Sequence, residues 1–271
     1  MNWLAFVGLG LCGSCLSLRA LDTLKASDYI YFDTYTSYIP GFGSEELSKL
    51  VGKAVTPLSR EDVEDKGGRE LIERALKSKV SFATLGDPFI ATTHVYIRNI
   101  AMGRGIPTLY VPGVSIHSAA FSLVGLQIYK SGPTATIVEP SEIYRPRAAF
   151  EKVVGNLKRG LHTLLLLDID VVKGRFMSFS RGAQVLAEGL IGYGVSPERL
   201  LGVGLSFVGS EGQSAVASTL LGLGGIHATA FPQSLIVPGR LDAVEAEALM
   251  FLGVNQEQLA AHARLVEELG R

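Results

Sequence analysis

The sequence predicts an α/β protein in which helices cover parallel sheets. Apolar runs of strand length alternate along the chain with helical patterns, which is typical of a parallel sheet covered on both faces. Hydrophobic residues make up 47% of the 271 residues and charged residues only 19%, so the chain has ample apolar surface for a core. A chain of this length is expected to form one large domain or two modest ones.

Composition argues against several classes of protein. The 25 Lys and Arg residues balance 26 Asp and Glu residues, so no basic excess attracts nucleic acid or an anionic membrane. The apolar N-terminal stretch has no positive n-region, and Gly8, Gly10 and Gly13 interrupt it. We therefore expect a cytoplasmic protein without a targeting or membrane-spanning segment. The low charge count also favours a homodimer that covers part of the apolar surface.

The front half of the chain repeats a strand and helix pattern. The expected strands are 3–7, 29–32, 80–84 and 105–111. Leucines recur at helical spacing over 16–24, and a Ser-rich helix with an acidic first turn follows the second strand. Ser59 and Asp62 match a capping box, which predicts a further helix running toward Lys77.

Near Pro112 and Gly113 the spacing of the strands becomes longer and less regular. We therefore expect an N-terminal α/β domain over 1–112 and a C-terminal α/β domain over 113–271. The expected later strands are 134–138, 161–167, 201–207 and 235–237, and two closing amphipathic helices are expected at 241–252 and 256–269.

A glycine-rich segment follows the first strand. Gly8, Gly10 and Gly13 match the G-x-G-x-x-G pattern of dinucleotide sites, and Asp33 stands where an acidic ribose ligand is expected. Alone, this pattern favours an NAD-dependent oxidoreductase. The same glycines would equally serve another nucleotide-like ligand or a structural tight turn.

Cys12 and Cys15 form a C-x-x-C pair within that glycine-rich segment. A redox dithiol is expected to precede a helix in a thioredoxin-like domain, and a zinc site would need a second Cys or Cys/His pair. We therefore expect two small, buried thiols that fill a crowded turn. The five histidines lie scattered, without carboxylates at ligand spacing, so no metal site is expected.

Two more polar segments follow expected strands, where open α/β sheets place ligand-binding loops. Asp87, in a Gly-Asp-Pro turn, is suited to bind a ligand amine or hydroxyl, or only to satisfy nearby backbone N–H groups. Ser115 and His117 follow the strand 105–111, either as ligand contacts or as satisfied core residues. The nucleophile elbow and the P-loop are both missing, which argues against a hydrolase triad and an NTPase.

Together, these segments resemble the diphthine synthase family, the methyltransferases of diphthamide biosynthesis in the tetrapyrrole-methylase-like superfamily. The Gly-Asp-Pro turn is shared across the superfamily, whereas Leu58–Val63 and Gly160–Leu165 look particular to diphthine synthases. The other similar segments are Phe6–Leu11, Tyr35–Ser37, Ala91–His94, Ser115-Ile116, Ser118-Ala119, Ile128–Lys130, Leu167–Ile169, Leu235–Gly239 and Glu245–Glu247. The likeness thus spans nearly the whole chain.

The resemblance implies two α/β domains of the tetrapyrrole-methylase-like type, with S-adenosylmethionine in the cleft between them, in a homodimer. The cofactor contacts that it implies are Leu11, Asp87, Ile90, Ser115, Ile116, Leu167, Val208 and Gln233. Family members often have His where this chain has Gln233, and the region 208–227 aligns poorly.

The reaction implied by the resemblance is methylation of the amino group of a modified histidine on translation elongation factor 2. The sequence shows no obvious general base, so we expect catalysis by positioning and assign no catalytic residue. Asp33, Tyr35 and His162 are candidates for substrate contacts, although structural roles would explain them equally well. The alternatives are a methyltransferase of corrin or tetrapyrrole precursors, which would need basic residues around the substrate, and the NAD-dependent oxidoreductase.

Overall fold

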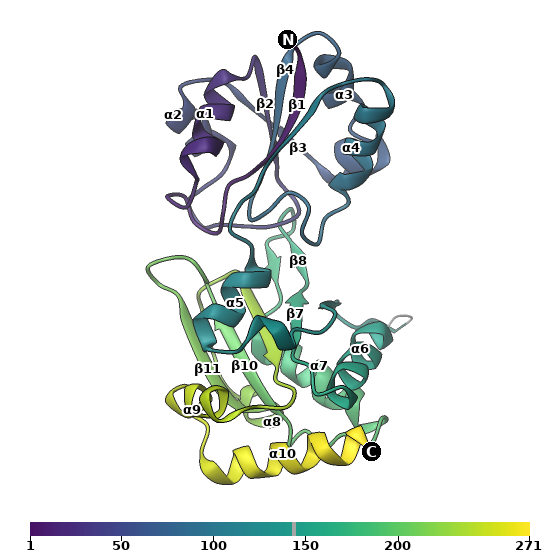
Figure 1. The fold of residues 1–271 in the computed structure, drawn as a ribbon, viewed down its shortest axis with the longest axis vertical. Coiled ribbons are helices and arrows are strands. Elements are labelled where there is room, and N and C mark those ends of the chain that lie inside the picture. The colour runs from purple at the N-terminus through teal and green to yellow at the C-terminus, as the bar shows by residue number, and fades with distance from the viewer. Residues whose placement is uncertain (143–144) are drawn as a thin grey trace. The chain divides into compact units, whose positions relative to one another are not determined.

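The computed structural model describes residues 1–142 and 145–271, which divide into two compact units (Figure 1). The first unit comprises Met1–Ile116 with Val171–Lys173, and the second comprises His117–Asp170 with Gly174–Arg271. The first unit extends beyond the predicted boundary at residue 112. The loop after residue 111 stays with the first unit because the Gly113 N–H donates to Asp87 Oδ2 at 3.2 Å.

The first unit has a parallel sheet between two helical layers, as the sequence predicts (Figure 1). Its strand order is β3-β2-β4-β1-β5. Alternate residues of one strand point to opposite faces, so Leu4 and Phe6 pack in the core with helices α3 and α4, and Ala5 and Val7 with α1 and α2. The elements are β1 (Trp3–Gly8), α1 (Leu18–Ala26), β2 (Tyr29–Asp33), α2 (Ser44–Val51), β3 (Val55–Leu58), α3 (Arg69–Ala75), β4 (Lys79–Thr84), α4 (His94–Gly103) and β5 (Thr108–Val111).

The single helix predicted from Ser59 toward Lys77 is wrong. The capping pair forms, since the Asp62 N–H donates to Ser59 Oγ at 3.3 Å, but it opens a π-helical turn, η1 (Glu61–Asp65). Gly67 and Gly68 then take φ values of +61° and +63°. Two consecutive left-handed residues cannot continue a right-handed helix, so the chain restarts as α3.

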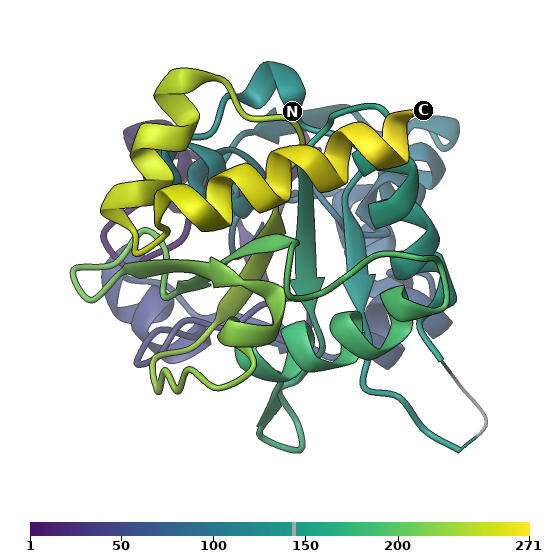
Figure 2. The ribbon, with the colours of Figure 1, turned by 90° about the horizontal axis from the view of Figure 1, so that it is seen from below.

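The second unit has a mixed sheet, so the expectation of parallel strands fails here. Its order is β11-β10-β12-β7-β6, and only β6 and β7 pair in parallel. The long helix α10 packs on its core through Leu265 and Val266 (Figure 2). The main elements are α5 (Ile116–Val124), η2 (Ile128–Lys130), β6 (Ala135–Ile137), α6 (Arg147–Lys158), β7 (Thr163–Leu167), α7 (Phe179–Ile191), β10 (Leu201–Ser206), β11 (Ser214–Thr219), α8 (Leu220–Leu223), β12 (Gln233–Val237), α9 (Ala243–Phe251) and α10 (Gln256–Gly270). A short hairpin, β8 (Ile169–Asp170) and β9 (Arg175–Phe176), follows β7.

Candidate functional site

Three loops leave one edge of the first sheet next to one another. Strands β4, β1 and β5 are adjacent and parallel, so their carboxyl ends at Thr84, Gly8 and Val111 share an edge. The loops that follow are residues 9–17, 85–93 and 112–115. This edge is where open α/β sheets bind ligands, and below we call these segments the three loops.

Glycines allow the three loops to touch. A Cβ atom on Gly113 would lie 2.0 Å from the Gly86 carbonyl oxygen, and one on Gly8 would lie 2.4 Å from the Gly113 nitrogen. Gly10 and Gly86 also exchange backbone hydrogen bonds, with N···O distances of 3.2 and 2.8 Å. The structure therefore brings together the glycine-rich segment, the Gly-Asp-Pro turn and the segment after β5.

The carboxylate of Asp87 connects these loops. It is 6% exposed, and its Oδ1 accepts a hydrogen bond from the Phe89 N–H at 2.9 Å. Its Oδ2 accepts from the Tyr110 hydroxyl at 2.6 Å and from the Gly113 N–H at 3.2 Å. Of the two roles considered for Asp87, the structure shows the satisfaction of nearby donors, and a direct ligand contact stays a prediction.

Tyr110 is a site residue that sequence reasoning missed. It lies near the end of β5, and burial followed by the hydrogen bond to Asp87 raises the pKa of its hydroxyl to about 12. Its ring centroid lies 5.2 Å from that of Phe89, and the Arg98 guanidinium carbon lies 4.6 Å from the Phe89 centroid. These stacked groups brace the Gly-Asp-Pro turn. The sequence predicted the strand, but it did not indicate that the Tyr110 side chain reaches Asp87 on a neighbouring loop.

Five of the eight predicted cofactor contacts lie on the three loops or directly after them. Asp87 and Ser115 are buried, Leu11 and Ile116 are half-buried, and Ile90 is exposed. Ile116 is the first residue of α5. Polar backbone, apolar side chains and one carboxylate thus line the same edge of the first unit.

The other three predicted contacts lie together at one edge of the second sheet. Because β12 runs antiparallel to β7 and β10, the end of β7 at Leu167, the start of β12 at Gln233 and the end of β10 share that edge. Val208 follows β10, and all three side chains are buried. The Gln233 amide already accepts from the Phe179 N–H at 2.8 Å and donates to two backbone carbonyls, so its ligand contact stays a prediction.

Asp33 organises the turn after β2. Its carboxylate accepts from the Tyr35 and Thr36 N–H groups at 3.0 and 3.1 Å and from the Thr36 hydroxyl. His94 Nε2 lies 3.4 Å from Asp33 Oδ2, and burial lowers the pKa of His94 although Asp33 opposes this. The Tyr35 hydroxyl is buried with no hydrogen-bond partner among the described residues. Asp33 therefore has the structural role, whereas the contact proposed for Tyr35 stays a prediction.

His162 does not suit a substrate contact. It is fully buried at the start of the second sheet's β7, and its Nδ1 accepts from the Gly239 N–H at 2.8 Å. Its Nε2 therefore carries the proton and donates to Glu245 Oε1 at 3.0 Å. Burial lowers the pKa of His162 although Glu245 opposes this, and a neutral ring agrees with an Nδ1 that accepts a hydrogen bond. With both ring nitrogens bonded to protein groups, this candidate is wrong.

Glu245 is the centre of this buried network. Burial alone would raise its pKa, but hydrogen bonds from Lys130, the Gln127 and Asp242 N–H groups and His162 outweigh burial and lower it. The network joins the η2 segment, the start of β7 and helix α9. Two segments that carry the family resemblance, around His162 and Glu245, therefore hold the framework of the second unit.

The prediction of two buried free thiols is wrong. Cys12 and Cys15 form a disulfide with a Cα–Cα distance of 5.0 Å, and both residues are half-buried. The four-residue turn brings the two side chains within bonding reach. Spacing alone does not distinguish this geometry from packed thiols.

The dinucleotide interpretation of the glycines also fails. In a dinucleotide site the helix that binds the pyrophosphate begins within the glycine fingerprint. Helix α1 begins only at Leu18, after the N-cap Ser17, well beyond Gly13. The carboxylate of Asp33 is occupied by its own turn.

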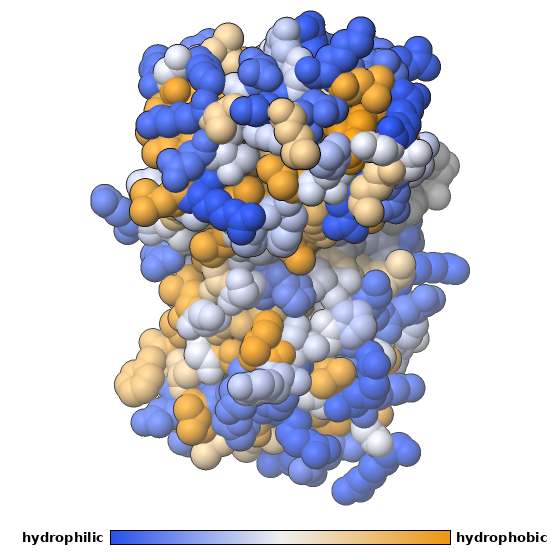
Figure 3. Space-filling view, turned by 45° about the horizontal axis from the view of Figure 1, so that its top comes forward, coloured by the Kyte–Doolittle hydropathy of each residue, from blue (hydrophilic) through white to orange (hydrophobic). Residues whose placement is uncertain are grey.

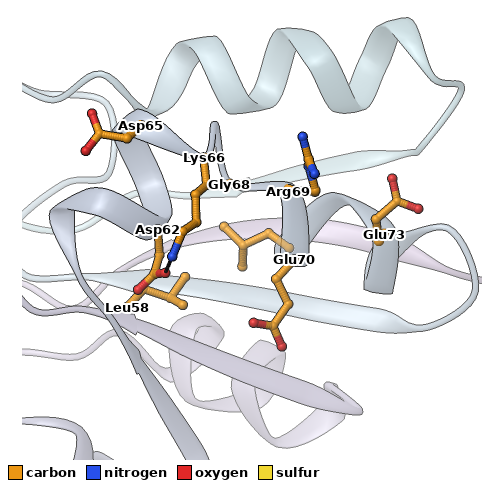
Figure 4. A pocket seen from close by; sticks show the side chains of 9 residues that line it. Leu58, Asp62, Asp65, Lys66, Gly68, Arg69, Glu70 and Glu73 are labelled. Carbon is orange, nitrogen blue, oxygen red and sulfur yellow. Dashed lines mark hydrogen bonds and ion pairs between the residues drawn. The ribbon is translucent and has the colours of Figure 1, made fainter.

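A separate pocket lies beside η1 and α3 (Figure 4). The predicted contacts do not line it. Lys66, which does line it, bridges Glu61 and Asp62 at 3.0 Å. Its lining residues are Leu58, Asp62, Asp65, Lys66, Gly68, Arg69, Glu70, Leu71 and Glu73. Within the described residues, 1–142 and 145–271, no group of His, Cys, Asp and Glu side chains is arranged to hold a metal ion.

The chain is similar to known proteins both in sequence and in fold. Residues 4–218 match the family model of tetrapyrrole (corrin/porphyrin) methylases. The chain is 39% identical to the diphthine synthase of Staphylothermus marinus, over 92% of this chain and 93% of the relative. It is 39% identical to that of Methanosarcina mazei, over 94% and 98%. A crystal structure of diphthine synthase superposes with a TM-score of 0.87 at 29% identity, covering 97% of this chain and 100% of that one. The chain therefore belongs to the tetrapyrrole methylase family and, within it, to the diphthine synthases.

Proposed function

We propose that this methyltransferase uses S-adenosylmethionine to methylate the amino group of the modified histidine on translation elongation factor 2, in diphthamide biosynthesis. The observation that carries the proposal is the 39% identity to a diphthine synthase over 92% of the chain. The three loops provide the place in the first unit where such a cofactor would bind.

The residues of the three loops fit this cofactor. Leu11 and Ile90 offer apolar surface to an adenine ring, and loop backbone groups offer hydrogen bonds to its polar parts. Thr84 Oγ1 is buried at the end of β4 without a hydrogen-bond partner among the described residues, a state that costs about 1–3 kcal/mol unless a ligand or water completes it. The proposed contacts are Leu11, Asp87, Ile90, Ser115 and Ile116, with Leu167, Val208 and Gln233 from the second unit.

The chemistry of the cofactor leaves positioning to the protein. When bound, S-adenosylmethionine supplies an activated methyl group on its sulfonium. The chain must hold the acceptor amine in line, in its deprotonated form, with water excluded. Fixed geometry of this kind lowers a barrier by as much as about 7–11 kcal/mol. Asp87 contributes by tying together the loops that hold the cofactor, and we assign no general base.

Mass spectrometry tests the proposal. Elongation factor 2 carrying the unmethylated histidine modification is incubated with the chain and S-adenosylmethionine. We expect mass steps of one methylene each, with fragmentation placing the methyl groups on the amine. No mass change, in a sample where calorimetry detects cofactor binding, would contradict the protein substrate.

An absence of any mass change would favour a second candidate function, methylation of a corrin or tetrapyrrole precursor. The match to the tetrapyrrole (corrin/porphyrin) methylase family supports this candidate. Such precursors carry several carboxylates and need cations around them. The three loops contain neither Lys nor Arg, which is why we place this candidate second.

Two further proposals concern assembly and location. We propose a homodimer that covers part of the exposed apolar surface. Val244 and Phe251 on α9 are 68% and 83% exposed. Other apolar residues reach the surface that Figure 3 shows. We also propose a cytoplasmic location, where translation elongation takes place. No helix in the described part of the chain has the length and apolar character to cross a membrane.

A further inference from the structure

The C-x-x-C pair is a motif that the proposed function does not use. Cys12 and Cys15 are joined as a disulfide within the first of the three loops. Both residues are half-buried and neither belongs to the hydrophobic core.

Cys15 packs directly on Gly10. Gly10 adopts φ +77°, and a Cβ atom there would lie 2.8 Å from Cys15 Cβ and 3.0 Å from the Cys15 carbonyl oxygen. The Cys15 N–H also donates to the Cys12 carbonyl oxygen at 3.0 Å. The segment from Gly10 to Cys15 is therefore one compact turn that the disulfide closes.

This turn is connected to the Gly-Asp-Pro turn by main-chain hydrogen bonds. Gly10 and Gly86 exchange two bonds at 3.2 and 2.8 Å, and Gly86 precedes Asp87. Leu11, a proposed cofactor contact, lies between Gly10 and the disulfide. A change in the conformational freedom of the turn therefore reaches two of the loops proposed to hold the cofactor.

The geometry points to the Cys12–Cys15 disulfide as a positioning element of the cofactor site, and hence to a cofactor affinity that depends on the redox state of the pair. The bond restricts the turn before the ligand arrives, so less conformational freedom is lost on binding. Reduction frees the segment between Gly10 and Cys15 and weakens binding. This inference rests on the proposed function, because it assumes that the three loops hold S-adenosylmethionine.

The redox step is thiol–disulfide exchange with a dithiol. One thiolate of the reductant attacks a cysteine Sγ, the Cys12–Cys15 bond breaks, and a mixed disulfide forms with release of the other cysteine thiolate. The second thiol of the reductant then displaces the bound cysteine and closes a cyclic disulfide. Two electrons pass from the dithiol to the protein, and the two cysteine thiolates take up the two protons that the dithiol releases.

Calorimetry with S-adenosylmethionine tests the inference on the full chain purified without reductant. We expect the affinity to fall about tenfold after treatment with dithiothreitol and to recover on reoxidation. A Cys12→Ser/Cys15→Ser double variant should bind S-adenosylmethionine with the affinity of the reduced chain, and dithiothreitol should not change that affinity. Thr56→Ser, at an exposed position of β3 outside the three loops, is the control and should keep the full redox response.

Equal affinities of the oxidised and reduced chains, with two thiols titrated only after reduction, would overturn the inference. Two free thiols in chain purified without reductant would overturn it as well. If neither form binds S-adenosylmethionine, it is the proposed function that fails. Amide hydrogen exchange then decides the inference: faster exchange at Gly10 and Gly86 on reduction supports the coupling of the loops, and unchanged exchange refutes it.

Discussion

The two units use buried acids in different ways. In the second unit, Glu245 accepts four hydrogen bonds, and His162 and His262 each have both ring nitrogens bonded to protein groups. In the first unit, Asp87 ties loops together at an edge where the Thr84 hydroxyl has no partner among the described residues. The difference teaches that a fully bonded polar cluster holds a framework. By contrast, a buried hydroxyl without a partner among the described residues, such as Thr84 at the end of β4 or Ser206 at the end of β10, leaves hydrogen-bonding capacity for a ligand or water.

The strongest way to break this comparison is Glu245→Ala. The substitution leaves the Gln127 N–H without its acceptor and removes the buried one of the two carboxylates beside Lys130, and we expect the free energy of unfolding to fall by about 3 kcal/mol in chemical denaturation. Glu247→Ala, on the exposed side of the same helix, is the control and should change little. Equal stabilities of the two variants would remove the framework role of Glu245.

A change of pH should alter the stability of the second unit by a smaller amount. Burial lowers the pKa of His262 to about 4 from an ordinary value of about 6.5, so the unfolded chain binds more protons than the folded chain between pH 4 and pH 6.5. The free energy of unfolding should therefore fall as the pH drops toward 4, by about 2 kcal/mol on reaching pH 5. His262→Gln, whose amide donates and accepts like the neutral ring, should flatten this slope. A stability that rises toward pH 5 would contradict the assignment.

Asp87→Asn tests the first unit. The amide keeps the shape of the side chain but replaces one acceptor oxygen, so either the Phe89 N–H or the Tyr110 hydroxyl loses its carboxylate partner. We expect S-adenosylmethionine to bind about tenfold more weakly in calorimetry, a loss of about 1.4 kcal/mol, with the fold retained and the thermal unfolding midpoint lowered by about 3 °C. Asp22→Asn, an exposed carboxylate on α1, should leave the affinity unchanged. If the Asp87 variant binds S-adenosylmethionine as tightly as the wild type, Asp87 plays no part in the cofactor site.

Tyr110→Phe sharpens the comparison with a smaller change. It removes one hydroxyl bond to Asp87 and keeps the ring that stacks on Phe89, so we expect about 1 kcal/mol weaker cofactor binding. Tyr96→Phe on α4, where the ring is 61% exposed, is the matched control. If both variants bind the cofactor equally well, the Tyr110 hydroxyl does not position Asp87.

The sequence predicted elements with a clear hydrophobic period better than those with polar or proline-containing patterns. Strands such as β1 and β4 and the closing helices α9 and α10 lie where their patterns predicted them. Strand β3 contains Pro57, which an edge strand tolerates, and β11 alternates small and polar residues in a Ser-rich region. Neither gave a strand signal.

The candidate site also contains features that the sequence predicted and features that it did not. Family likeness and strand ends were enough to place Asp87 and Ser115 on neighbouring loops, because adjacent parallel strands end at one edge. The bond from Tyr110 to Asp87 and the disulfide depend on side-chain directions across loops. The full bonding of His162 depends on residues far apart in sequence. No local pattern carries that information.

A crystal structure of the chain with S-adenosylhomocysteine, the stable product of the cofactor, tests the central claim most directly. We predict that the ligand contacts Leu11, the segment Gly86–Ile90 and Ser115, while His162 and Glu245 keep their bonds to one another. A ligand seated away from the three loops, or bonded to the Glu245 network, would contradict the account.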